Sequence, residues 1–202
     1  MKNNNLLRAI AVAAACALLS ACATIGTTAN PQTAVGAYRD SIDFDGRLLV
    51  NYERDGKPDT LSVKFSWVQT AREVGVSLLS PTGQTVAKIS VTREAATLTE
   101  GNKPPRMARD IDALAAQTLG FALPVTGLRD WLQGYATLPG GARFAASQAN
   151  NTVTTADGWK LTFVSWQDGP GGLPAPRRID AQRDATAGAG PLALRIVVDP
   201  KS

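Results

Sequence analysis

Alternation of apolar and polar residues, repeated over several short stretches, constrains the fold of this chain more than any other feature. Residues 44–52 place apolar side chains on every second position, and residues 61–67 repeat the pattern after an Asp55-Gly56 turn. Such a pattern gives a strand one apolar face, and an Asp-Gly pair favours a tight hairpin. Because the alternation resumes in residues 74–78 and 87–91, the first half of the chain is predicted to form an antiparallel meander.

The middle of the chain changes to helical spacing. Residues 110–119 carry acidic residues in the first turn and are followed by Gly120, and residues 125–133 lie between Pro124 and Gly134. Strands are then predicted again at residues 152–155, 159–166, 178–182 and 192–198. About nine or ten short strands with two clear helices predict a mainly β fold, an antiparallel barrel or half-barrel with helices on or inside it.

The composition excludes most kinds of catalytic and metal site. The chain has no His, and its two Cys, Cys16 and Cys22, both lie near the N-terminus. These counts exclude Ser-His-Asp and Cys-His catalysis, histidine metal sites and a disulfide framework. We therefore expect no metal and no cofactor.

The N-terminus reads as a lipoprotein signal. Lys2 and Arg8 precede an apolar run at residues 9–19 that is too short to span a bilayer as a permanent helix. The run ends in Leu19-Ser20-Ala21-Cys22, which matches the bacterial lipobox, whereas Cys16 lacks the preceding Leu. Cys22 is therefore the predicted site of lipid attachment.

This signal divides the chain into three parts. Residues 1–21 are the predicted signal peptide, residues 22–35 the acylated N-terminus and flexible tether, and residues 36–202 a single domain. Because Ala23 and not Asp follows the cysteine, outer-membrane sorting is favoured. Without Lys2 and Arg8 the chain has 19 basic and 17 acidic residues, a near balance that argues against a nucleic-acid partner.

Several sequence blocks, taken in order, resemble the LolB family of outer-membrane lipoprotein receptors. They are Phe65-Ser66-Trp67-Val68-Gln69, Ser80-Pro81-Thr82-Gly83-Gln84-Thr85, the block from Gly120 to Gly134, and Gly158-Trp159-Lys160. The similarity runs from about Tyr38 to Val198, nearly the whole mature chain.

The resemblance implies an incomplete antiparallel β-barrel, or half-barrel, in which two or three helices cover a hydrophobic cavity. It further implies a protein anchored in the outer membrane and facing the periplasm. Such a protein accepts acylated lipoproteins from the soluble carrier LolA and inserts them into the inner leaflet without nucleotide hydrolysis. We expect it to act as a monomer.

Two sets of site residues follow from the predicted cavity and from the resemblance. The cavity is expected to be lined by large apolar residues of the strands and the second helix: Phe44, Leu48, Val50, Phe65, Trp67, Val76, Leu78, Ile89, Trp131, Leu161 and Phe163. Pro81, Thr82 and Gly83 correspond to the loop that places cargo into the bilayer. The family usually has an apolar residue, typically Leu, where this chain has Thr82, and a plain turn explains Pro-Thr-Gly equally well.

Three other functions remain open at this stage. A lipocalin-like lipoprotein would bind a small apolar ligand without passing it on, and a structural lipoprotein would only display a surface. For an enzyme, the nearest carboxylate pairs are Asp43 with Asp45 and Asp110 with Asp112. The second pair occupies the first turn of a predicted helix, where acidic residues favour the helix dipole, so neither pair suggests a catalytic site. We do not expect an enzyme.

Overall fold

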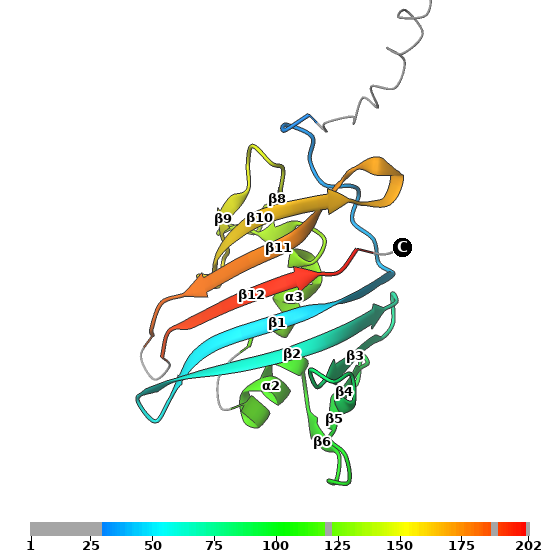
Figure 1. Cartoon of the computed structure of the whole chain (residues 1–202), viewed down its shortest axis with the longest axis vertical. Coiled ribbons are helices and arrows are strands. Elements are labelled where there is room, and N and C mark those ends of the chain that lie inside the picture. The colour runs from blue at the N-terminus through cyan, green and yellow to red at the C-terminus, as the bar shows by residue number, and fades with distance from the viewer. Residues whose placement is uncertain (1–29, 120–122, 187–189, 201–202) are drawn as a thin grey trace, which may run out of the picture.

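In the computed structural model, which describes residues 30–119, 123–186 and 190–200, the fold is dominated by one antiparallel sheet. Its ten strands lie in the order β6-β5-β4-β3-β2-β1-β12-β11-β10-β9 (Figure 1). In chain order the strands are β1 (Ile42–Arg54), β2 (Lys57–Gln69), β3 (Val74–Leu79), β4 (Thr85–Val91), β5 (Ala96–Thr99), β6 (Arg106–Ala108), β9 (Thr152–Thr154), β10 (Lys160–Asp168), β11 (Pro174–Arg183) and β12 (Leu192–Val198).

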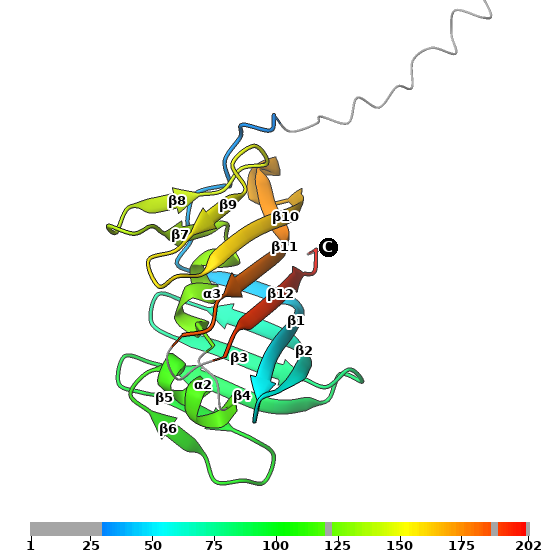
Figure 2. The same ribbon diagram turned by 90° about the vertical axis from the view of Figure 1, so that its left-hand side faces the viewer.

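The sheet curves around two helices without closing into a barrel. Strands β6 and β9 end the strand order and do not pair with each other among the described residues. Helices α2 (Ile111–Leu119) and α3 (Val125–Trp131) cover one face of the sheet, while the other face of β1, β2, β11 and β12 is bare (Figures 1 and 2). The half-barrel predicted from alternation and from the resemblance is confirmed.

Local chemistry explains the longest hairpin and the helix start. Arg54 pairs with Lys57, and Asp55 and Gly56 both have positive φ angles, 53° and 72°, as a two-residue type I′ turn requires. At the start of α2, the backbone N–H of Ala113 donates to Asp110 Oδ1 at 2.8 Å. The turn between β1 and β2 therefore has the geometry that the predicted antiparallel hairpin requires.

Three short strands were not predicted, and two of them form a separate hairpin. Strands β6, β7 (Tyr135–Thr137) and β8 (Arg143–Ala145) have three residues each, too few to show a period. β7 and β8 pair only with each other among the described strands. The glycine-rich stretch after β10 holds a single 3-10 turn, η1 (Pro170–Gly172), between β10 and β11.

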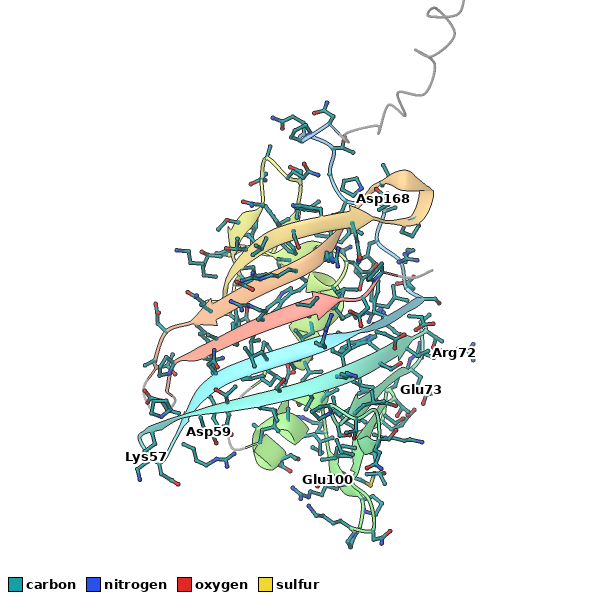
Figure 3. The ribbon with its side chains drawn as sticks, in the orientation of Figure 1. Lys57, Asp59, Arg72, Glu73, Glu100 and Asp168 are labelled. Carbon is teal, nitrogen blue, oxygen red and sulfur yellow. The ribbon has the colours of Figure 1, made fainter. Side chains whose placement is uncertain are left out.

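Charged side chains collect at the ends of strands. Lys57 and Asp59 lie near the β1–β2 turn, and Arg72 and Glu73 lie between β2 and β3 (Figure 3). The apolar side chains instead alternate inward along the strands, as in β12, where Leu192, Leu194, Ile196 and Val198 are buried. The core therefore lies between the concave face of the sheet and the two helices.

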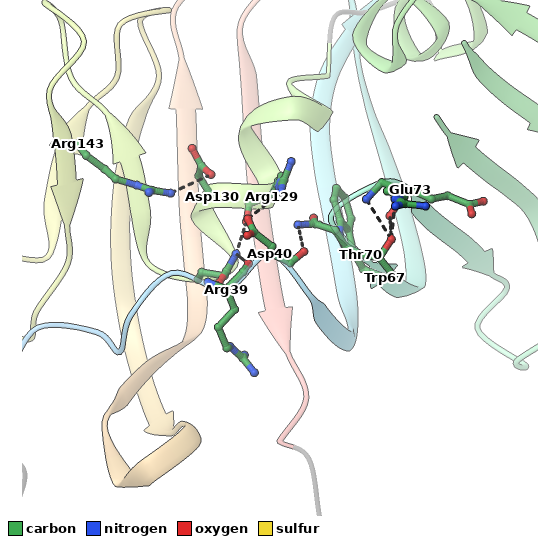
Figure 4. A network of polar contacts seen from close by, with 11 residues as sticks. Arg39, Asp40, Trp67, Thr70, Glu73, Arg129, Asp130 and Arg143 are labelled. Carbon is green, nitrogen blue, oxygen red and sulfur yellow. Dashed lines mark hydrogen bonds and ion pairs between the residues drawn. The ribbon is translucent and has the colours of Figure 1, made fainter. Parts of the chain in front are cut away.

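Residues 31–41, which we call the strap, cross the end of α3 before β1 begins. The Val35 N–H donates to the Ala146 carbonyl at 2.9 Å, and Val35 is buried. Gln133, also buried, accepts from the Arg39 N–H at 2.9 Å and donates to the Arg39 carbonyl at 3.2 Å (Figure 4). Packing against the domain thus begins within the last residues of the expected tether, while residues 1–29, with Cys22, lie outside the described part.

An aromatic and charged cluster holds the strap from its other side. The Arg143 guanidinium lies over the Tyr38 ring at 3.9 Å and over the Tyr135 ring at 4.6 Å. Arg143 also lies 3.7 Å from Asp130 (Figure 4). Burial and the Asp130 carboxylate raise the pKa of Tyr38, although the Arg129 guanidinium opposes them. The strap is thereby fixed against α3 and β7.

Candidate functional site

An apolar cavity of about 230 Å³ lies between the sheet and the two helices. Strands β1 to β5 and β12 provide one wall, and α2, α3 and the residues around them provide the other. Among the described residues that line it, only Glu100 and Thr118 carry a polar or charged side chain other than the indole of Trp67. A water-poor space with such walls suits hydrocarbon and not a charged ligand.

Six of the eleven residues expected to line a cavity do line this one, and five lie elsewhere. The six are Leu48, Phe65, Trp67, Val76, Leu78 and Ile89. Phe44 instead lines an open groove at the other end of β1, and Val50, Trp131, Leu161 and Phe163 are buried outside the cavity lining.

Aromatic packing explains why the cavity does not extend under β10, where Leu161 and Phe163 were expected to line it. The Trp131 ring meets Trp159 edge to face at a centroid distance of 5.6 Å, and Phe163 stacks on Phe144 at 6.3 Å. Trp159 and Phe163 are fully buried. Large rings therefore fill the space under β10, and the cavity lies under β1 to β5.

Trp67 is held in the cavity wall by a hydrogen-bonded chain. Its Nε1–H donates to Gln69 Oε1 at 3.2 Å, and Gln69 Nε2 donates to the Asp40 carbonyl of the strap at 3.0 Å (Figure 4). Gln69 is only 2% exposed, so both of its polar groups need partners within the protein. The orientation of the Trp67 ring is thus tied to the position of the strap.

Helix residues of the cavity wall were not named from the sequence. Ile111, Leu114, Ala115 and Thr118 all line the cavity from α2. Their spacing of three and four residues marks one face of a helix, so this periodicity could have identified them. Across the two helices, Asp112 Oδ1 accepts a hydrogen bond from the Thr126 N–H at 3.0 Å, which joins α2 to the first turn of α3.

The loop that contains Pro81, Thr82 and Gly83 connects β3 to β4 beside the cavity. The Gly83 N–H donates to the Ser80 carbonyl at 2.9 Å, which is the predicted turn, and Gly83 has a φ of 90°. The hydroxyl groups of Ser80 and Thr82 lie 2.8 Å apart, and Ser80 Oγ also accepts from the Gln84 N–H at 3.2 Å. The hydroxyl of Thr82 is therefore hydrogen-bonded inside the loop.

Among the described residues, one charged side chain lies in the cavity lining, and it forms ion pairs with two basic side chains. Glu100 follows β5 (Figure 3), where its carboxylate lies 2.8 Å from Arg106 Nη2 and 3.7 Å from Lys103 Nζ. This arrangement keeps the charge paired at the edge of the apolar space.

A larger hollow, of about 780 Å³, lies where the strap, β10 and β11 meet. Its walls include the charged residues Arg39, Asp43, Asp168 and Asp199. Because a hydrocarbon chain needs an apolar enclosure, this groove is less suited to acyl chains than the smaller cavity.

Neither a metal-binding cluster nor a membrane-spanning helix is present in the part of the chain that the structure describes. That part holds no group of three or more His, Cys, Asp or Glu side chains able to bind a metal ion. None of its helices has the length and apolar character needed to cross a membrane.

Comparison with known proteins identifies the family. The family model described as outer membrane lipoprotein LolB matches residues 40–200. Outer-membrane lipoprotein LolB from Cupriavidus taiwanensis is 40% identical over 192 residues, with 92% of each chain covered. The protein of that name from Ralstonia nicotianae is 37% identical over 201 residues, with 96% of each chain covered. A LolA-superfamily structure from Nitrosomonas europaea gives a TM-score of 0.45 at 10% identity and covers 82% of this chain and 87% of its own. From the family match and the curated relatives, this chain belongs to the LolB family.

Proposed function

We propose that this protein receives acylated lipoproteins at the outer membrane and passes them into its inner leaflet. The carrier LolA supplies the cargo, and the acyl chains of the cargo occupy the cavity between the sheet and α2 and α3. The observation that carries the proposal is the nearly all-apolar lining of this cavity in a chain of the LolB family.

The energetics of acyl chains support a sheltered transfer. At about 0.8 kcal/mol per buried methylene, the some forty methylenes of three chains give on the order of 30 kcal/mol of insertion free energy. The free-energy cost of passage through water is therefore prohibitive, whereas movement of the chains from a cavity to a bilayer lowers the free energy. The receptor only needs to lower the barrier, so nucleotide hydrolysis is not required.

The size of the cavity requires it to open when it is loaded. Pockets for drug-sized ligands have volumes of roughly 300–1,000 Å³, and this cavity has about 230 Å³. Its walls belong to separate layers, the sheet and the two helices, so α2 and α3 can move away from the sheet without breaking a strand pair. We propose that cargo binding separates these layers.

We also propose that the N-terminal segment attaches the domain to the membrane. Residues 1–21 are removed as a signal peptide, Cys22 receives the lipid, and the tether up to residue 35 holds the domain on the periplasmic side of the outer membrane as a monomer. The lipid at Cys22 keeps the cavity close to the bilayer that receives the cargo.

A transfer assay tests this function. A variant that lacks residues 1–22 is mixed with LolA loaded with a radiolabelled lipoprotein, and the label is followed by co-purification. We expect the label to move to the variant. Binding of a fluorescent fatty acid without transfer from LolA would favour a lipocalin-like binder instead.

Depletion in cells separates a receptor from a structural lipoprotein. We expect loss of the protein to strand many unrelated lipoproteins in the periplasm. Normal sorting after depletion would contradict the proposed role.

A further inference from the structure

Val86 differs from every other described residue in the cavity lining because it is exposed. Its relative exposure is 46%, whereas the other lining residues are buried or half-buried. A residue that both lines the cavity and faces solvent marks where the cavity communicates with the outside. The opening therefore lies at the start of β4.

A β-bulge puts Val86 in this position. Leu78 pairs with Ala87 and Leu79 pairs with Thr85, so Val86 has no partner on β3. In a regular strand, neighbouring residues point to opposite faces, and Val86 would lie on the face opposite to Ala87. Both residues line the cavity instead. Bulges that redirect a side chain are frequent beside functional sites.

The exposure of Val86 has no explanation in the stability of the fold. A half-exposed valine forfeits much of the free energy that full burial of such a side chain contributes. The residues before it, from Pro81 to Thr85, are all exposed, and the Thr82 hydroxyl is hydrogen-bonded within the loop. At this edge, Val86 is thus the apolar side chain that continues the cavity wall to the surface.

We propose that Val86 forms the threshold of the cavity, the side chain over which acyl chains pass as they enter and leave. The inference rests on the proposed function and assigns a positioning residue to it. A passing chain covers the exposed part of Val86, which lowers the barrier to transit while the occupied state stays the same. Changes at Val86 should therefore alter the rate of transfer and leave the final extent of transfer unchanged.

Val164 provides a matched control. It is also a valine, it is 41% exposed, and it also lies at a register irregularity, between Phe163, which pairs with Ile179, and Ser165, which pairs with Arg178. It does not line the cavity. The same substitution at both sites separates the position of Val86 from the general effect of a new charge on an exposed bulge.

The test follows a fluorescently labelled lipoprotein as it leaves LolA for the mature chain held in vesicles of phosphatidylethanolamine and phosphatidylglycerol. We expect Val86→Glu to slow transfer about tenfold, equivalent to about 1.4 kcal/mol in the barrier, with an unchanged end point. Val86→Ser should slow transfer less, and Val86→Leu and Val164→Glu should match the wild type. Thermal unfolding of each variant checks that the fold is intact.

The outcomes separate this inference from the proposed function. Equal rates for the wild type and Val86→Glu, or equal slowing by Val86→Glu and Val164→Glu, would overturn the role of Val86 while the receptor function stands. A lower end point at an unchanged rate would also overturn it, because that result indicates an effect on occupancy. A wild-type chain that accepts no cargo would overturn the proposed function itself.

Discussion

Gly46 shows how one residue shapes the cavity wall. It lies on β1 opposite Phe65, and a Cβ atom at this position would clash with the Val197 carbonyl oxygen and lie 2.7 Å from Phe65 Cζ. The absence of a side chain at Gly46 leaves room for the Phe65 ring, which lines the cavity. Here glycine is needed for close approach between strands and not for a positive φ.

We predict that Gly46→Ala lowers the free energy of unfolding by about 1–3 kcal/mol, the usual cost of overpacking. The carbonyl of Val197 is backbone and cannot turn away, so β1 and β12 must separate locally. Urea denaturation measures the loss. Gly75→Ala is the control, because its new Cβ would meet only the Val68 carbonyl, at 3.8 Å. An equal loss in both variants would point to a general intolerance of alanine in the sheet.

Thr82 lies in the loop between β3 and β4, and we predict that substitutions there affect only delivery of the cargo. We predict that Thr82→Leu preserves or improves insertion of cargo into vesicles, because it adds an apolar contact at the loop tip. Thr82→Glu should weaken insertion and leave uptake from LolA intact, since the loop tip carries none of the cavity lining. Separate assays of uptake and insertion check this. Equal insertion by all three proteins would remove the loop from the mechanism.

Strand periodicity in the sequence predicted only part of the cavity lining. Alternation identifies which side chains face inward, and this was enough for Phe65, Trp67 and Val76. It does not say which part of the concave face the aromatic rings fill, so Leu161 was expected at the cavity and is buried outside its lining. Val86 lay beyond such reasoning because the bulge reverses the alternation that the sequence suggests.

At the scale of elements, ion pairs add to the pairing of β11 with β12 on the face away from the helices. Arg178 Nη2 lies 2.6 Å from Asp180 Oδ2, and Arg195 Nε on β12 lies 3.4 Å from Asp180 Oδ1. Burial raises the pKa of Asp180, but these two guanidinium groups outweigh it and hold the pKa below its usual value.

This lowered pKa predicts an acid-sensitive contribution to stability. Because the carboxyl is more acidic in the folded chain than in the unfolded one, where its pKa is about 3.9, its contribution is complete above that value. The contribution is lost as the pH falls through the folded pKa. Asp180→Asn should therefore be less stable than the wild type at pH 7, with the difference shrinking as the pH falls through the lowered folded pKa of Asp180.

Urea denaturation across this pH range measures the difference. Asp55→Asn, at an exposed position of the β1–β2 turn, serves as a control for the loss of one carboxylate. A difference between the wild type and Asp180→Asn that stays constant with pH would contradict the assignment.

The long strands were predicted from their periods, whereas the short strands β6, β7 and β8 were not. β1 and β2 span 13 residues each, enough for several periods, and the boundary of α2 is set by the Asp110 cap. β7 and β8 have three residues each, which is too few to show a period. The pairing of β1 with β12 joins distant parts of the chain, and no local pattern specifies it.

At the scale of the whole molecule, the interior is divided into a filled half and a hollow half. Trp131, Trp159 and Phe163 pack the half under β10, while the half under β1 to β5 keeps a cavity. An apolar hollow of this kind beside a well-packed half is consistent with a space that holds a ligand.

A side chain that fills the cavity should raise the free energy of unfolding and abolish the binding of acyl chains. Ala115 lines the cavity from α2, and Ala115→Phe would place a ring in it. We predict a gain of about 1 kcal/mol in the free energy of unfolding, or about 2–4 °C in Tm, together with a loss of fatty-acid binding and of transfer from LolA. Thermal unfolding and binding of a fluorescent fatty acid measure both effects. Ala113→Phe, on the same helix but outside the cavity lining, should keep binding intact. Unchanged binding by a stabilised Ala115→Phe protein would mean that acyl chains occupy another part of the molecule, and the groove beside the strap would then be the next place to test.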